Sequence, residues 1–128
     1  FIQEYTPQRI YTHHPGDVNI DHQRISEAVI TAARSTPNHP TNTILFFEVP
    51  SSTEWQVSPV KATFHPNWFV DISETLQLKQ KALAAYDSEM RAFPHPRSYS
   101  TVEHLAHWRG ATAGVEAAEA FVLARHRE

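Results

Sequence analysis

The chain has 128 residues, which is long enough for one domain with a buried core. Eleven Lys and Arg residues against 14 Asp and Glu residues give a net charge of −3, so we expect no broad basic surface for nucleic acid. The absence of cysteine excludes disulfides, thiolate metal ligands and a cysteine nucleophile. Nine histidines remain, and any metal site must therefore use imidazole and carboxylate.

The first part of the chain predicts two short elements and then a longer helix. Residues 1–5 resemble the last turn of a helix, and 9–13 form a β-branched and aromatic run typical of a strand. After a polar turn, Asp21 stands where an N-cap is expected, ahead of a helix over about 22–34. Its apolar positions recur every three or four residues: Ile25, Ala28, Val29 and Ala32. Pro37 forbids its continuation.

The rest of the chain alternates strands and helices. Residues 43–49 form a β-favouring run with four consecutive apolar residues, which is typical of a central strand covered on both faces. A second strand is predicted over 68–72, followed by a helix that Ser73 caps and that ends near residue 91. A last helix begins at residue 100 and ends between 107 and 117, before a strand over 120–123. This order predicts an α/β layer protein.

No segment suggests a membrane span or a secretory signal. The longest apolar run, 44–47, is too short to cross a bilayer, and no basic segment precedes an apolar one at the start. We therefore expect a cytoplasmic protein.

The segment 12–22 concentrates the side chains that carry chemistry. Three histidines, two aspartates and one asparagine fall within it, between a predicted strand and a predicted helix. Open α/β sheets place their ligand sites at such junctions, and these side chains bind zinc or move protons. The alternative is structural: Asp21 caps the helix, Asp17 and Asn19 shape the turn, and the histidines are solvated.

This segment, Thr-His-His-Pro-Gly-Asp-Val-Asn-Ile-Asp-His, resembles the histidine motif of the PIG-L/LmbE-like family of zinc-dependent N-acetylglucosaminyl deacetylases. Further matches follow in the family's order: Phe64-His65-Pro66-Asn67, Val70 to Ser73, Lys79 to Ala82, Ala85 to Ser88, Arg109-Gly110 with Gly114, and Ala118 to Phe121. The resemblance implies a three-layer, Rossmann-like α/β sheet with helices on both faces. The family's N-terminal His-Pro-Asp-Asp motif is absent, so residues 1–128 are similar to the C-terminal portion of one such domain.

The resemblance also implies roles for individual residues. His22 is similar to the histidine that completes the Zn²⁺ site, and Asp21 beside it is a candidate to orient that imidazole. Asn19 stands where many members have a histidine; it can donate to an oxyanion but cannot deliver a proton. Asn19 and Asp21 are thus the candidate catalytic residues. The candidate substrate-binding residues are His14, Asp17 and Arg109.

Other residues carry weaker signals. Ser51 and Ser52 lack the glycines of a nucleophile elbow, which disfavours a serine hydrolase. His104 and His107 are three residues apart on a predicted helix, but no third ligand is evident, and we interpret them as partly exposed helix residues.

The implied activity is the zinc-dependent hydrolytic removal of an acetyl group from an N-acetylated amino sugar or sugar conjugate. One imidazole does not make a catalytic zinc site, so we expect this chain alone to be inactive. It would need the missing N-terminal segment, supplied by the same protein or by a complementary chain, and an incomplete sheet also favours a homo-oligomer. Two alternatives remain: a non-catalytic fragment or degenerate homologue used for binding or assembly, and a sugar-binding module without chemistry.

Overall fold

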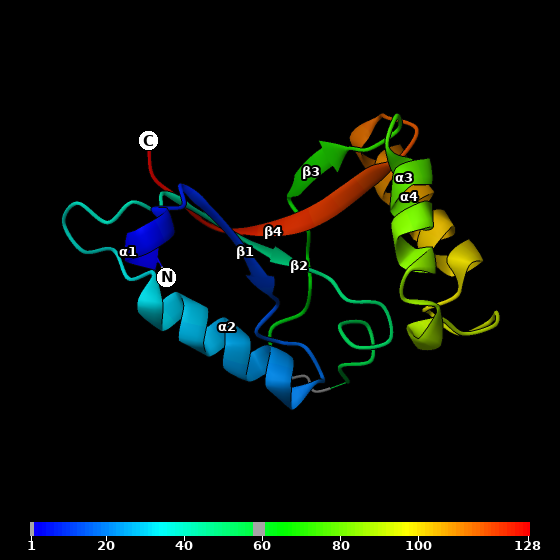
Figure 1. Ribbon diagram of the computed structural model, residues 1–128, viewed down its shortest axis with the longest axis horizontal. Coiled ribbons are helices and arrows are strands. Elements are labelled where there is room, and N and C mark those ends of the chain that lie inside the picture. The colour runs from blue at the N-terminus through cyan, green and yellow to red at the C-terminus, as the bar shows by residue number, and fades with distance from the viewer. Residues whose placement is uncertain (1, 58–60) are drawn as a thin grey trace. The chain divides into compact units, whose positions relative to one another are not determined.

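A computed structural model describes residues 2–57 and 61–128 (Figure 1). The elements in chain order are α1 (Ile2–Tyr5), β1 (Arg9–His13), α2 (Ile20–Ala32), β2 (Thr43–Phe47), β3 (Trp68–Asp71), α3 (Leu76–Ala84), the 3₁₀ turn η1 (Asp87–Glu89), α4 (Tyr99–Ala113) and β4 (Ala118–His126). The chain divides into two compact units, Phe1–Trp68 with Phe121–Glu128 and Phe69–Ala120. That residues 1–128 act as a single domain stays a prediction.

The strands form one mixed sheet in the order β1-β2-β4-β3. β1 and β2 are parallel, with Arg9 beside Thr43 and His13 beside Phe47, while β2 and β4 are antiparallel. Parallel strands need a crossover, and α2 supplies it between β1 and β2. β2 has a strand on each side, and its first four residues are buried, so both of its faces are covered, as its apolar run predicts. The predicted α/β class and the central position of this strand are therefore confirmed.

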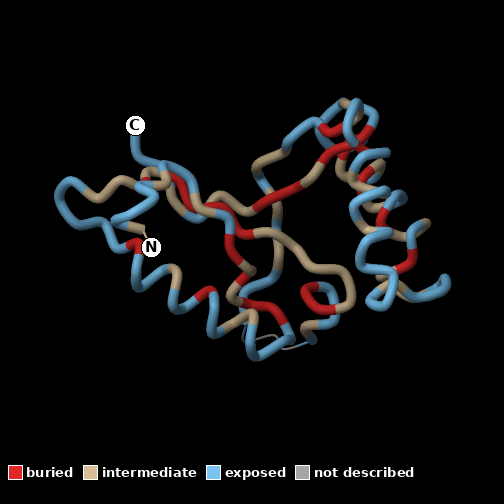
Figure 2. Tube along the Cα trace, viewed as in Figure 1, coloured by how far each residue is buried: buried red, intermediate tan, exposed pale blue. Residues whose placement is uncertain are grey.

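The core of the first unit lies between α2 and the sheet. Ala33, Ile44 and Phe46 form its buried cluster, and further apolar side chains pack against it: Ile2, Ile10 and Val122. α2 packs along β1 (Figure 1), and in Figure 2 buried stretches run through β2 and the start of β4. α2 contributes to this cluster only through Ala33, its C-cap, so apolar burial anchors the helix to the sheet at its C-terminal end.

The apolar residues that mark one face of α2 are mostly exposed in the structure. Ile25 is 45% exposed, and Ala28 and Ala32 are exposed too, whereas Ser26 and Ala33 are buried. The helix is rotated so that the face holding Ser26 meets β1. Periodicity identifies the helix, but this chain covers only part of its apolar surface.

The second unit has its own small core. Ile72, Leu76, Ala106 and Ala117 form the buried cluster, in which α3 packs against α4. At Gly110 a Cβ atom would lie 2.7 Å from the Ala117 Cα, so only glycine permits this approach.

Several predicted helix ends need correction. The N-cap of α2 is Asn19 and not the predicted Asp21. The Oδ1 atom of Asn19 accepts a hydrogen bond from the Asp21 amide at 2.9 Å. Ser73 does not cap α3: its hydroxyl donates to Asp71 and accepts from the Ala117 amide, and α3 begins after Thr75. α3 also ends at residue 84, well before the predicted 91. No helix among the described residues is long and apolar enough to cross a membrane.

Candidate functional site

The turn between β1 and α2 is fixed by its own backbone. The Asp17 amide donates to the His14 carbonyl at 3.1 Å, and the Gly16 amide donates to His14 Nδ1 at 3.1 Å. A Cβ atom on Gly16 would lie 1.9 Å from the Ala62 carbonyl oxygen, so no other residue fits without a shift. The turn therefore delivers Asp17 into the interior at one defined place.

Asp17 is the centre of a buried hydrogen-bond network. Its side chain is fully buried. Oδ1 accepts from the Ser52 hydroxyl and from the Asn19 amide at 2.8 Å. Oδ2 accepts from the Thr53 hydroxyl at 2.9 Å and lies 3.2 Å from His22 Nδ1. Both carboxylate oxygens are thus satisfied, as a buried charge requires.

These contacts decide the ionisation of Asp17. Burial alone would raise its pKa, but hydrogen bonds from Ser52, the Asn19 amide, Thr53 and His22 outweigh burial and lower the pKa below its ordinary value. The carboxylate is therefore charged at neutral pH, and it can only accept hydrogen bonds.

His22 is consequently held in one tautomer. Because its neighbour at Nδ1 is a carboxylate, Nδ1 carries the proton and Nε2 keeps its lone pair. In the described part of the chain Nε2 has no hydrogen-bond partner, and the side chain is 18% exposed. A buried carboxylate behind a partly exposed imidazole is the arrangement that orients a metal-binding histidine.

Ser52 supports this network and does not serve as a nucleophile. Its hydroxyl donates to Asp17 and lies 3.3 Å from His22 Nδ1, the same nitrogen that faces Asp17. A Ser-His-Asp triad uses opposite ring nitrogens for serine and aspartate. The residue is also only 5% exposed, so the geometry agrees with the prediction against a serine hydrolase.

His13 is the last residue of β1, and His14 is the first residue after it. His13 stacks on His22, with ring centroids 4.0 Å apart. The pKa of His13 is lowered by burial and by His22, with Asp17 acting in the opposite direction. The pKa of His14 is also lowered, mainly by burial, and its ring packs edge-on against Phe46 and Phe64. Both imidazoles are therefore neutral at pH 7.

The structure changes several predicted roles. The carboxylate beside His22 is Asp17, and Asp21 is exposed in the first turn of α2. Asp17 and His14 are predicted to touch substrate, but both are buried, so they shape the site from beneath. Arg109 lies in α4, in the second unit, and its substrate-binding role stays a prediction.

The donor set fits one ligand of a zinc site. Among the described residues no group of three His, Asp or Glu side chains is placed to hold a metal ion. A catalytic zinc site needs three protein ligands. Nε2 of His22 suits one of them, and the others would have to come from outside the described residues.

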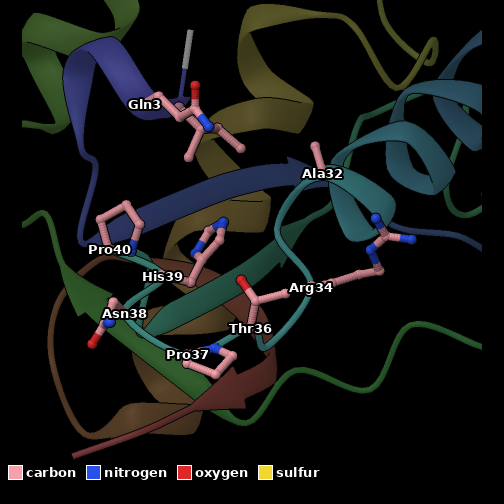
Figure 3. Close-up of a pocket in the computed structure, with 9 residues that line it drawn as sticks. Gln3, Ala32, Arg34, Thr36, Pro37, Asn38, His39 and Pro40 are labelled. Atoms are coloured by element: carbon pink, nitrogen blue, oxygen red, sulfur yellow. The ribbon is translucent and has the colours of Figure 1, made fainter.

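A separate hollow lies at the other end of α2 (Figure 3). Its volume is about 360 Å³. Its lining residues are Ile2, Gln3, Ala32, Arg34, Thr36, Pro37, Asn38, His39 and Pro40. None of the predicted site residues lines it.

Sequence reasoning missed Ser52 and Thr53 as partners of Asp17. They follow Asp17 by 35 and 36 residues, so no local pattern links them. A signal did exist: β1 and β2 are parallel, and their carboxyl ends meet at the same edge of the sheet. The hydroxyls in the loop after β2 could have been expected near the turn after β1.

No protein-family model and no curated protein matches the chain. Two solved structures share its fold. The conserved protein TT1542 from Thermus thermophilus has a TM-score of 0.70 and 21% identity, over 99% of this chain and 56% of its own. The N,N'-diacetylchitobiose deacetylase from Pyrococcus horikoshii has a TM-score of 0.67 and 19% identity, over 97% and 48%. The chain thus spans about half the length of each.

Proposed function

We propose that this chain is the C-terminal portion of a PIG-L/LmbE-like, zinc-dependent hydrolase that removes the acetyl group from an N-acetylated amino sugar or sugar conjugate. Two observations support the proposal: the histidine motif over 12–22, and the fold shared with a deacetylase of a chitobiose derivative. The observation that carries it is His22, whose Nδ1 faces the buried Asp17 carboxylate while Nε2 stays without a partner among the described residues.

In this proposal His22 binds zinc through Nε2, and Asp17 holds the imidazole in the required tautomer. Bound zinc supplies a Lewis acid for the acetyl carbonyl and acidifies a water molecule. The Oδ1 atom of Asn19 is engaged by the Asp21 amide, so its Nδ2 group is the donor for an oxyanion. Arg109 stays the proposed substrate-binding residue, whereas the orienting role first assigned to Asp21 passes to Asp17.

The remaining zinc ligands and the general base come from an N-terminal segment of the same protein, a complementary chain or another copy. We further propose that the protein acts in the cytoplasm. A second candidate, a non-catalytic homologue used for binding or assembly, is favoured by one observation: the described residues hold no three-ligand cluster.

The test is acetate release from N-acetylglucosamine and N,N'-diacetylchitobiose by the gene product that contains this chain. We expect activity that a chelator removes and that zinc restores. His22→Ala should lower kcat/KM by at least about 100-fold, since a metal ligand is lost. His104→Ala, an exposed histidine of α4, is the matched control and should retain full activity. A His22→Ala protein as active as the wild type would overturn the proposal. A wild-type protein that stays inactive both with and without added zinc would favour the second candidate.

A further inference from the structure

His13, the last residue of β1, lies against the imidazole of His22. The two ring centroids are 4.0 Å apart and their planes differ by 23°, which is a stacked pair. The His13 ring also contacts the ring of Phe47, its register partner on β2. Their centroids are 4.7 Å apart and their planes differ by 57°. The strand pair thus presents the face of His13 to His22.

The contacts at Nδ1 of His22 do not orient its ring completely. Asp17 Oδ2 and Ser52 Oγ lie 3.2 and 3.3 Å from this one nitrogen. Hydrogen bonds at a single atom leave the ring free to tilt about that atom, and tilt changes the direction in which Nε2 points. A stacked ring restricts tilt, because the two faces must stay nearly parallel.

A second observation concerns the hydrogen bonding of His13. Its Nδ1 atom is buried and has no partner in the part of the chain that the structure describes. A buried polar atom without a partner carries a desolvation cost. The ring is therefore placed for its face and not for a hydrogen bond at Nδ1.

We propose that His13 is a positioning residue for His22: its ring face fixes the plane of the imidazole, Asp17 fixes the tautomer, and together they give Nε2 one direction. This inference rests on the proposed function insofar as Nε2 is the atom that would bind zinc. The stacking role itself does not depend on bound zinc.

The test compares ring-nitrogen NMR spectra of the gene product that contains this chain with those of its His13→Phe and His13→Ala variants. Phenylalanine keeps a stacking face and removes the unpartnered nitrogen, whereas alanine removes the face. In the wild type and in His13→Phe we expect a single His22 tautomer with a slowly exchanging Nδ1 proton. In His13→Ala the Nδ1 proton should exchange faster, because the tilting ring opens its contact with Asp17 more often, while Asp17 keeps the same tautomer.

A titration with zinc chloride, followed on the His22 signals, gives an independent measurement. His13→Phe should bind zinc as the wild type does, and His13→Ala should bind about 10-fold more weakly, the lower end of what losing a supporting contact costs. If His13→Ala does not fold, as judged by circular dichroism, His13→Leu fills the space without a stacking ring and takes its place.

The outcomes separate the two proposals. An alanine or leucine variant in which the Nδ1 proton of His22 exchanges at the wild-type rate and zinc binds with the wild-type affinity would overturn the role of His13. A wild-type gene product that binds zinc without any change in the His22 signals would count against zinc binding by His22, and the comparison of Nδ1 proton exchange would still decide the role of His13.

Discussion

At the scale of single residues, Asp17 governs the candidate site. The same carboxylate receives hydrogen bonds from a turn amide, from two hydroxyls after β2 and from the imidazole of α2. A charged group that is fully buried is tolerated only when it is paired in this way. Asp21, four residues later, is exposed and makes none of these contacts through its carboxylate in the described chain.

Replacing the buried carboxylate should therefore destabilise the protein. Asp17→Asn replaces a carboxylate oxygen, which accepts hydrogen bonds, with an NH₂ group that faces other donors and cannot accept from them. We expect the free energy of unfolding to fall by about 2–4 kcal/mol. Asp21→Asn is the matched control and should change it by less than about 0.5 kcal/mol. Urea unfolding of the two variants measures both values. Equal stability of the two variants would contradict the network.

The direction of the pKa shifts gives a pH dependence. The pKa values of His13 and His14 are lowered from 6.5 in the folded protein, mainly by burial. As the pH falls, the unfolded chain therefore binds protons at these residues before the folded chain does. The pKa of Asp17 is lowered from 3.8, so its contribution is lost as the pH falls through its pKa in the folded protein. Both effects have the same sign, and the free energy of unfolding should rise with pH from about 3 to about 7.

Urea unfolding at pH 5.5 and pH 7.5 checks the histidine part of this dependence. His14→Asn keeps a side-chain acceptor for the Gly16 amide but removes one titrating group. The difference between the two pH values should be smaller in this variant than in the wild type. A dependence that is steeper in the variant would show that the sign is wrong.

At the scale of elements, the turn between β1 and α2 connects the sheet to the site. Sequence patterns locate the strand, the turn and the helix, but they assign the cap to Asp21 when Asn19 performs it. Both residue types cap helices, and the choice depends on where the chain enters the helix. Similarly, Ser73 is a good cap by type, yet its hydroxyl contacts Asp71 and Ala117.

The turn also gives a prediction for its glycine. Gly16→Ala introduces a Cβ atom against the Ala62 carbonyl, and we expect a loss of about 1–3 kcal/mol together with a changed His22 spectrum. At Gly114, the C-cap of α4, φ is +78° and nothing lies within 4 Å of a Cβ atom. Gly114→Ala should cost only about 1 kcal/mol for its backbone and leave His22 unchanged. NMR spectra of both variants make the comparison.

At the scale of the whole molecule, the sheet has an open edge at β1. Among the described strands β1 pairs with β2 alone, and apolar side chains near it are exposed: Tyr11, Val18, Ile20, Ile25 and Ile30. An unpaired strand edge and uncovered apolar residues favour association. The two solved structures with this fold contain about twice the length of chain.

We therefore expect the isolated chain to associate. Sedimentation velocity between about 5 and 200 µM should show a concentration-dependent increase in mass, and hydrogen exchange of β1 should slow as the concentration rises. Ile25→Lys, on the exposed side of α2, should weaken association without lowering the melting temperature. A monodisperse monomer with unprotected β1 amides at every concentration would contradict this expectation.

The sequence by itself determined which segments become strands and helices, because hydrophobic periodicity and turn residues are local properties of the chain. It also placed the candidate site within residues 12–22, since the histidines and carboxylates cluster there. Only the tertiary structure decided that Asp17 faces His22, that Ser52 and Thr53 complete the network, and which side of α2 is buried. Those choices depend on how parallel strands distant in sequence bring their ends together, and on how far the helix is rotated against the sheet.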